Sequence, residues 1–135
     1  MTARKFKTAS VQRSDYSTYL KKAKEFHDTM LQAQKEKRWN AVGLNAVHCA
    51  ISAADALLVF HIGQRSIDPD HRVVVELMIN SLNTPDAANE SKTLQKIINQ
   101  KNLIEYEQRT FREKEADLII KHTVRFYNWV ISKLG

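Results

Sequence analysis

The sequence predicts an all-α fold, a bundle of four to five helices that run up and down. Gly and Pro are scarce, with three and two among 135 residues, whereas a sandwich or barrel needs a turn roughly every ten residues. Apolar residues recur every three or four positions along most of the chain, which is the period of an amphipathic helix. We expect one helical domain over residues 14–135, preceded by a basic N-terminal tail, residues 1–13.

The first predicted helix runs from Asp15 to about Trp39. Its apolar side chains recur at three- and four-residue spacings and form a single stripe, as in a helix that packs against a core. Ser14 is the expected N-cap, and Asp15 in the first turn interacts favourably with the helix dipole.

The second predicted helix begins near Arg38 or Asn40 and ends near His61. It is rich in alanine and apolar nearly all round, which is typical of a helix at the centre of a bundle. Gly63 follows directly and is the expected C-terminal stop, because glycine readily adopts the left-handed conformation that ends a helix.

The third predicted helix follows a loop, with Asp68 as its N-cap and Pro69 at its first position. Its three consecutive valines, at positions 73–75, are typical of strands. The Asp-Pro start and the lack of a second predicted strand favour a helix.

For the last part of the chain, the sequence predicts a loop at residues 81–89 and two further helices. The fourth helix ends near Gln108. The fifth begins at a capping box formed by Thr110 and Glu113, and its apolar stripe continues to Leu134.

Composition excludes several classes of protein. The chain has no Gly-rich phosphate loop, so we expect no cofactor of the kind that such loops bind. A single cysteine, Cys49, cannot form an intramolecular disulfide, and the histidines lack the spacing of a metal site. The longest run without a formal charge, Trp39 to Ala54, is too short and too polar to span a bilayer. We therefore expect a cytoplasmic protein that does not enter a membrane.

The net charge of +6 is spread unevenly. Residues 1–40 hold ten basic and four acidic side chains, so the excess lies in the tail and the first helix. Such an excess can attract nucleic acid by neutralising phosphates, or it can simply form a solvated face.

A line of polar side chains crosses the apolar second helix. Its members are Asn45, His48, Ser52 and Asp55. The spacings of three, four and three place all four on one face of the helix. Buried polar groups need partners, so this line predicts a functional site, a hydrogen-bonded seam in the bundle or a dimer interface.

A second candidate is an arginine and a histidine separated by five residues, Arg65 and His71. Arginine can hold a phosphate by two hydrogen bonds. His71 lies at the predicted start of a helix, where the dipole disfavours its protonation, so a neutral imidazole can accept a proton from a ribose hydroxyl. The alternative is structural, with Arg65 capping the second helix and His71 merely opening the third.

Several segments together resemble the HEPN superfamily of small helical-bundle proteins. They cover roughly residues 15–134 and comprise Trp39–His48 with Ala53–Leu58, Gly63–Ser66, Asp70–Arg72, Lys101–Glu107, Glu115–Ala116 and Arg125–Trp129. Members of that superfamily are commonly dimeric. Many are metal-independent RNases of toxin–antitoxin or defence systems with an R-x4–6-H motif, and others bind nucleotides or partner proteins without catalysis.

The resemblance implies a homodimer that acts on RNA or a nucleotide, with an antitoxin or a nucleotidyltransferase as a partner. In this hypothesis His71 is the acid or base and Arg65 holds phosphate. Asn45, His48 and Asp55 orient them. The expected binding residues are Asn45, Ser52, Lys101, Asn102 and Tyr106. The alternative is a non-catalytic helical module that binds a nucleotide or a protein.

Overall fold

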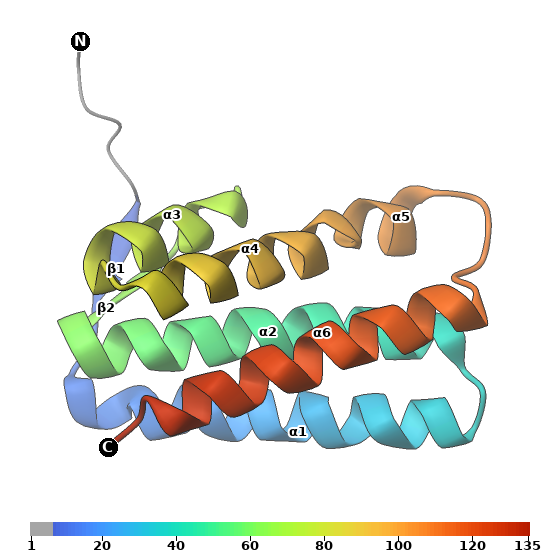
Figure 1. Ribbon diagram of the computed structural model, residues 1–135, viewed down its shortest axis with the longest axis horizontal. Coiled ribbons are helices and arrows are strands. Elements are labelled where there is room, and N and C mark those ends of the chain that lie inside the picture. The colour runs from blue at the N-terminus through green and yellow to red at the C-terminus, as the bar shows by residue number, and fades with distance from the viewer. Residues whose placement is uncertain (1–6) are drawn as a thin grey trace, which may run out of the picture.

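The computed structural model describes residues 7–135 and confirms the all-α bundle (Figure 1). The helices are α1 (Tyr16–Lys35), α2 (Trp39–Ile62), α3 (Arg72–Leu82), α4 (Pro85–Asn99), α5 (Lys101–Tyr106) and α6 (Glu113–Ser132). One 3-10 turn, η1 (Arg13–Asp15), precedes them, and two short strands are β1 (Thr8–Ser10) and β2 (Gln64–Ser66).

Helix α2 is the centre of the bundle, as its composition predicts. It contacts α1, α3, α4, α5 and α6, and in Figure 1 α1 runs alongside it while α6 crosses in front. Gly63 ends it with a left-handed φ of 64°, donating its N–H to the Val59 carbonyl at 3.0 Å, which confirms the predicted stop. By length and composition α2 could cross a membrane, but 72% of its most apolar window is buried inside the bundle, as in the core helix of a soluble protein.

Side chains from every long helix meet around α2. Fully buried examples are Met30 of α1, Leu57 and Leu58 of α2, Met78 of α3, Leu94 and Ile97 of α4, and Phe126 and Val130 of α6. The small alanines of α2 let these larger side chains approach its backbone closely, so one continuous core joins all the long helices.

The beginning and end of α1 differ from the prediction. Ser14 is not its N-cap, because residues 13–15 form a 3-10 turn and Asp15 occupies that position. The helix ends at Lys35, because Lys37 has a positive φ of 58° and reverses the chain before Trp39 opens α2.

Helix α3 begins later than predicted, at Arg72, and neither Asp68 nor Pro69 opens it. The Asp68 Oδ1 accepts the N–H of Asp70 at 3.0 Å, and the Asp70 Oδ1 accepts the N–H of Arg72, also at 3.0 Å. Each aspartate thus closes a turn two residues ahead, which competes with helix formation. These turns place His71 at the N-cap of α3.

The predicted loop at residues 81–89 is wrong at both ends, because only Asn83 and Thr84 lie outside a helix. Asn83 ends α3 in the left-handed region, and α4 starts at Pro85. The Thr84 Oγ1 accepts the N–H of Ala87 at 3.3 Å, so the Thr-Pro pair is a capped helix start rather than a loop. The predicted fourth helix also breaks at Gln100 into α4 and α5.

The predicted capping box of the last helix lies two residues too early. Thr110 and Glu113 do not form it, and Arg112 is the N-cap. The Glu115 carboxylate accepts the N–H of Arg112 at 2.9 Å and the guanidinium of Arg109 at 2.6 and 2.7 Å.

A small sheet joins the N-terminal segment to the α2–α3 connection. Strands β1 and β2 pair antiparallel with Ala9 opposite Arg65, and the pairing continues at 2.8 Å from the N–H of Val11 to the Gly63 carbonyl. Neither strand was predicted from the sequence, because each has only three residues and no apolar alternation. Residues 1–6 of the predicted tail lie outside the described residues.

Candidate functional site

A cavity of about 510 Å³ opens where the start of α3 meets the junction of α4 and α5. Four predicted site residues line it: His71, Lys101, Asn102 and Tyr106. We call it the α3–α5 cavity. The two sides are thirty residues apart in the sequence and meet because α3 packs against α4, which leads directly into α5.

His71 faces this cavity from the N-cap of α3. Partial burial lowers the pKa of His71, and the electrostatic influence of Lys101 and His48 lowers it further, although Glu105 and Asp70 act in the opposite direction. The imidazole is therefore neutral near pH 7 and is able to accept a proton or a hydrogen bond.

Lys101, Glu105 and Tyr106 form a compact group on α5. The Lys101 ammonium lies 2.8 Å from the Glu105 carboxylate and 5.7 Å from the centre of the Tyr106 ring. The pKa of Glu105 is lowered, chiefly by the hydrogen bond from Lys101. Tyr106 is 72% exposed, so most of its ring remains available to a planar ligand.

His48 approaches the same region from α2 and does not line the cavity. It is half-buried, with its ring 5.3 Å from that of Phe26, and it is close enough to influence the titration of both His71 and Glu105. His48 is thus the member of the polar line on α2 that influences groups in and beside the cavity.

Arg65 and Asp55 form a separate pair. The Arg65 Nη2 lies 3.5 Å from the Asp55 Oδ2, and the guanidinium carbon lies 5.2 Å from the centre of the Tyr19 ring. Burial raises the pKa of Asp55 to about 6, although the nearby Arg65 and Lys22 lower it. Arg65 does not line the α3–α5 cavity, so the structure does not place it beside His71 in the way that the R-x5-H hypothesis requires.

The two remaining members of the polar line, Asn45 and Ser52, do not line the cavity. The Asn45 side-chain amide donates to the Ala41 carbonyl of its own helix at 2.8 Å, which satisfies it locally. Ser52 is half-buried on α2 and does not line the cavity. The line is therefore not one continuous site.

Three polar residues that line the cavity, Asp70, Arg72 and Asn99, are not among the site residues predicted from the sequence. Arg72 follows His71, and its guanidinium is held by Asp70 through two contacts of 3.0 Å. Asn99 lies in the last turn of α4. Arg72 could have been found from its position next to His71. Asn99 reaches the cavity because the helix breaks at Gln100, and no pattern in the sequence predicts that break.

No group of three or more His, Cys, Asp or Glu side chains is placed to hold a metal ion within residues 7–135. The donors in the α3–α5 cavity are mainly cations, amides and a phenol, which suit an anionic and partly aromatic ligand.

Comparison of the chain with protein-family models, curated proteins and solved structures finds no match. The fold defines an all-α helical bundle with a polar cavity between the start of α3 and the α4–α5 junction.

Proposed function

We propose that this protein is a HEPN-like module that binds RNA or a nucleotide in the α3–α5 cavity. The observation that carries the proposal is the meeting of Lys101, Asn102, Tyr106 and His71 around one cavity. Lys101 and Arg72 supply positive charge for a phosphate, and the exposed Tyr106 ring offers a surface on which a base can stack. Asn102 supplies an amide that both donates and accepts hydrogen bonds.

Binding is tested by fluorescence anisotropy with a labelled single-stranded RNA of about ten nucleotides, a length in the range of single-strand sites, and with AMP as a competitor. The Tyr106→Ala variant should bind roughly tenfold more weakly, because stacking on an aromatic ring contributes about 1–3 kcal/mol. Tyr106 is largely exposed, so its truncation leaves the core intact.

Lys101→Gln and Lys21→Gln form a matched pair for the same assay. Both remove one positive charge, but Lys21 is an exposed residue of α1 that does not line the cavity. Lys101→Gln should weaken binding strongly and Lys21→Gln only slightly. Equal losses in the two variants would show that the RNA follows the overall positive charge rather than this cavity.

A second candidate, metal-independent cleavage of RNA, is favoured by one observation. The lowered pKa of His71 keeps its imidazole neutral, as a general base requires. Because Arg65 does not line the cavity, the cation beside the scissile phosphate would be Lys101 or Arg72. Wild-type protein in excess EDTA should then cleave a labelled RNA and His71→Ala should not; equal cleavage by both removes His71 from the reaction.

The HEPN resemblance alone supports the remaining parts of the proposal. These are a homodimer and a role of the toxin–antitoxin or defence type with an antitoxin or nucleotidyltransferase partner. The cytoplasmic location is proposed instead on the composition of the chain. In the non-catalytic alternative the chain is a module that binds a partner protein. Wild-type protein should then bind RNA no more tightly than Tyr106→Ala does.

A further inference from the structure

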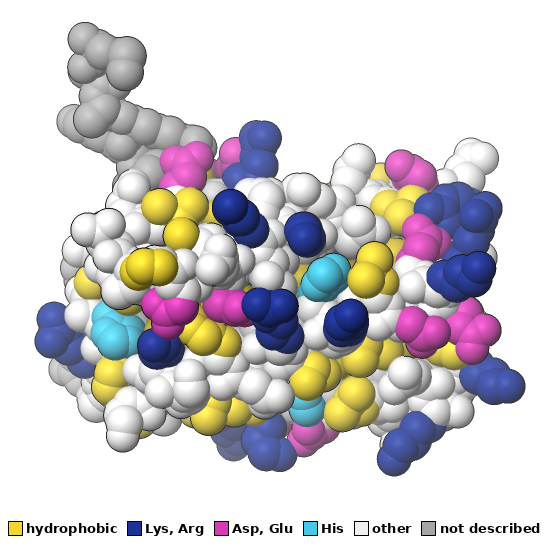
Figure 2. All heavy atoms as spheres, in the orientation of Figure 1, with side chains coloured by type: hydrophobic (Ala, Val, Ile, Leu, Met, Phe, Trp, Pro, Cys, Tyr) yellow, Lys and Arg dark blue, Asp and Glu magenta, His cyan; other side chains and the backbone are white. Residues whose placement is uncertain are grey.

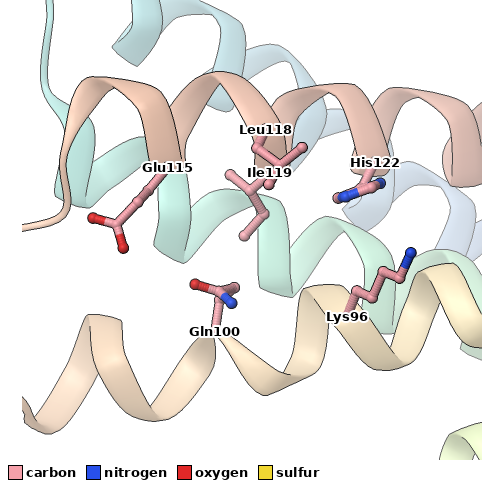
Figure 3. Close-up of a pocket in the computed structure, with 6 residues that line it drawn as sticks. All are labelled: Lys96, Gln100, Glu115, Leu118, Ile119 and His122. Carbon is pink, nitrogen blue, oxygen red and sulfur yellow. The ribbon is translucent and has the colours of Figure 1, made fainter.

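A second cavity, of about 320 Å³, lies between α4 and α6 and is separate from the site proposed above. Figure 3 labels its lining residues, which are Lys96 and Gln100 of α4 and the α4–α5 junction, and Glu115, Leu118, Ile119 and His122 of α6. None of them lines the α3–α5 cavity. We call it the α4–α6 cavity.

One end of the α4–α6 cavity is positively charged. Lys96 extends from α4 toward His122 on α6 (Figure 3). Burial lowers the pKa of His122, and the charges of Lys96, Lys121 and Arg125 lower it further. Figure 2 shows the wider setting, with Lys and Arg side chains around a histidine on the face that α4 and α6 form.

These cations are only partly neutralised. The Arg125 Nε lies 3.4 Å from the Glu90 Oε2, but neither Lys96 nor Lys121 forms an ion pair within residues 7–135. Cations that repel one another beside a half-buried imidazole leave a positive potential that an anion would relieve. His122 would donate one N–H to that anion, and Lys96 an ammonium group.

The middle and the far end of the cavity have a different character. Ile119 is 3% exposed and forms an apolar floor, whereas Leu118 is 55% exposed beside it. At the far end the Glu115 carboxylate is fixed by Arg109, and this pairing lowers the pKa of Glu115 to about 2. Glu115 is therefore ionised at neutral pH, and its ion pair with Arg109 leaves no unpaired cation, among the described residues that line this end of the cavity, for a second anionic group.

We propose that the α4–α6 cavity binds a small organic carboxylate with an aliphatic body. The carboxylate lies between Lys96 and His122, and the aliphatic part covers Ile119 and contacts Leu118. A nucleic-acid strand fits this pattern of charge less well, because the far end of the cavity offers the Glu115–Arg109 ion pair and no further unpaired cation among its described lining residues.

Hexanoate is the probe for a direct test, with the imidazole signals of His122 followed by NMR. Binding should shift these signals saturably and raise the pKa of His122, because a bound anion favours the imidazolium form. Acetate, which lacks the aliphatic body, and hexanol, which lacks the charge, should each bind roughly tenfold more weakly. An equal response to hexanol, or a linear shift shared with acetate, would overturn the proposal.

Variants separate this cavity from general electrostatic attraction. Lys96→Gln should weaken hexanoate binding roughly tenfold, and Lys21→Gln, an equal change of charge on α1, should leave it unchanged. Leu118→Asp should abolish binding, because it adds a like charge beside the ligand at an exposed position that the core does not need. If Lys96→Gln binds hexanoate as well as Lys21→Gln does, the proposal fails.

Discussion

Replacing Asp55 by Asn tests whether this carboxyl is buried within the central helix, because the substitution should change how the stability of the protein depends on pH. Asp55 is 5% exposed within α2, and burial raises its pKa from 3.8 to about 6 despite the neighbouring Arg65. The folded protein therefore holds a proton on Asp55 more tightly than the unfolded chain does. The contribution of this carboxyl to stability is greatest below about pH 4 and is lost as the pH rises to about 6.

The magnitude follows from the same values. One pKa unit is equivalent to 1.36 kcal/mol, so the rise from 3.8 to about 6 corresponds to about 3 kcal/mol. Wild-type protein should lose about that much free energy of unfolding from this group between about pH 4 and pH 7. Asp55→Asn does not titrate, so the variant should gain about 3 kcal/mol relative to wild type over the same range.

Urea unfolding at several pH values, followed by circular dichroism, measures this difference. Other titrating groups contribute to both proteins and cancel in the comparison. Asp117→Asn is the matched control, because Asp117 is exposed on α6 and the chemical change is the same. If the stability profiles of wild type and Asp55→Asn run parallel from pH 4 to pH 7, the reasoning about burial is refuted.

Two further predictions concern the C-terminal end and the interior of α2. Gly63→Ala should lower stability by about 1–2 kcal/mol in thermal unfolding, because φ is +64° and a Cβ would lie 3.2 Å from the Val11 carbonyl oxygen. Gly135→Ala, with the same φ and open space at the chain end, should change nothing. Cys49 is fully buried and its pKa is raised to about 12, so DTNB should label native protein at least about a thousandfold more slowly than urea-unfolded protein. Comparable labelling rates would contradict the burial of this thiol.

Most of the helices could be predicted from local signals. The apolar stripe of α1, the all-round apolar surface of α2 and the stop at Gly63 each depend on residues within one or two turns of one another. The helix starts were less predictable, because several side chains near each end compete for the same backbone N–H groups. Asp68 and Asp70 close their own turns and delay α3, whereas Thr84 caps α4 where a loop was expected.

The candidate site was predictable only in part, because four of the nine predicted site residues line the cavity. His71, Lys101, Asn102 and Tyr106 were identified from two separate segments, and the structure brings them to one cavity. The spacing of Arg65 and His71 suggested a shared site, but the β1–β2 pairing and the buried Asp55 hold Arg65 elsewhere. Spacing along the chain predicts proximity only within one regular element, and these two residues lie on either side of a loop.

The sequence by itself determined that this chain forms helices, that α2 occupies the centre and that no Gly-rich phosphate loop is present. Those properties depend on hydrophobic period and composition, which act locally. Only the tertiary structure decided which polar groups meet, because the faces that helices present to one another depend on packing across the whole core. That packing joined α3 to α5 around one cavity and left Lys96 and His122 facing each other across another.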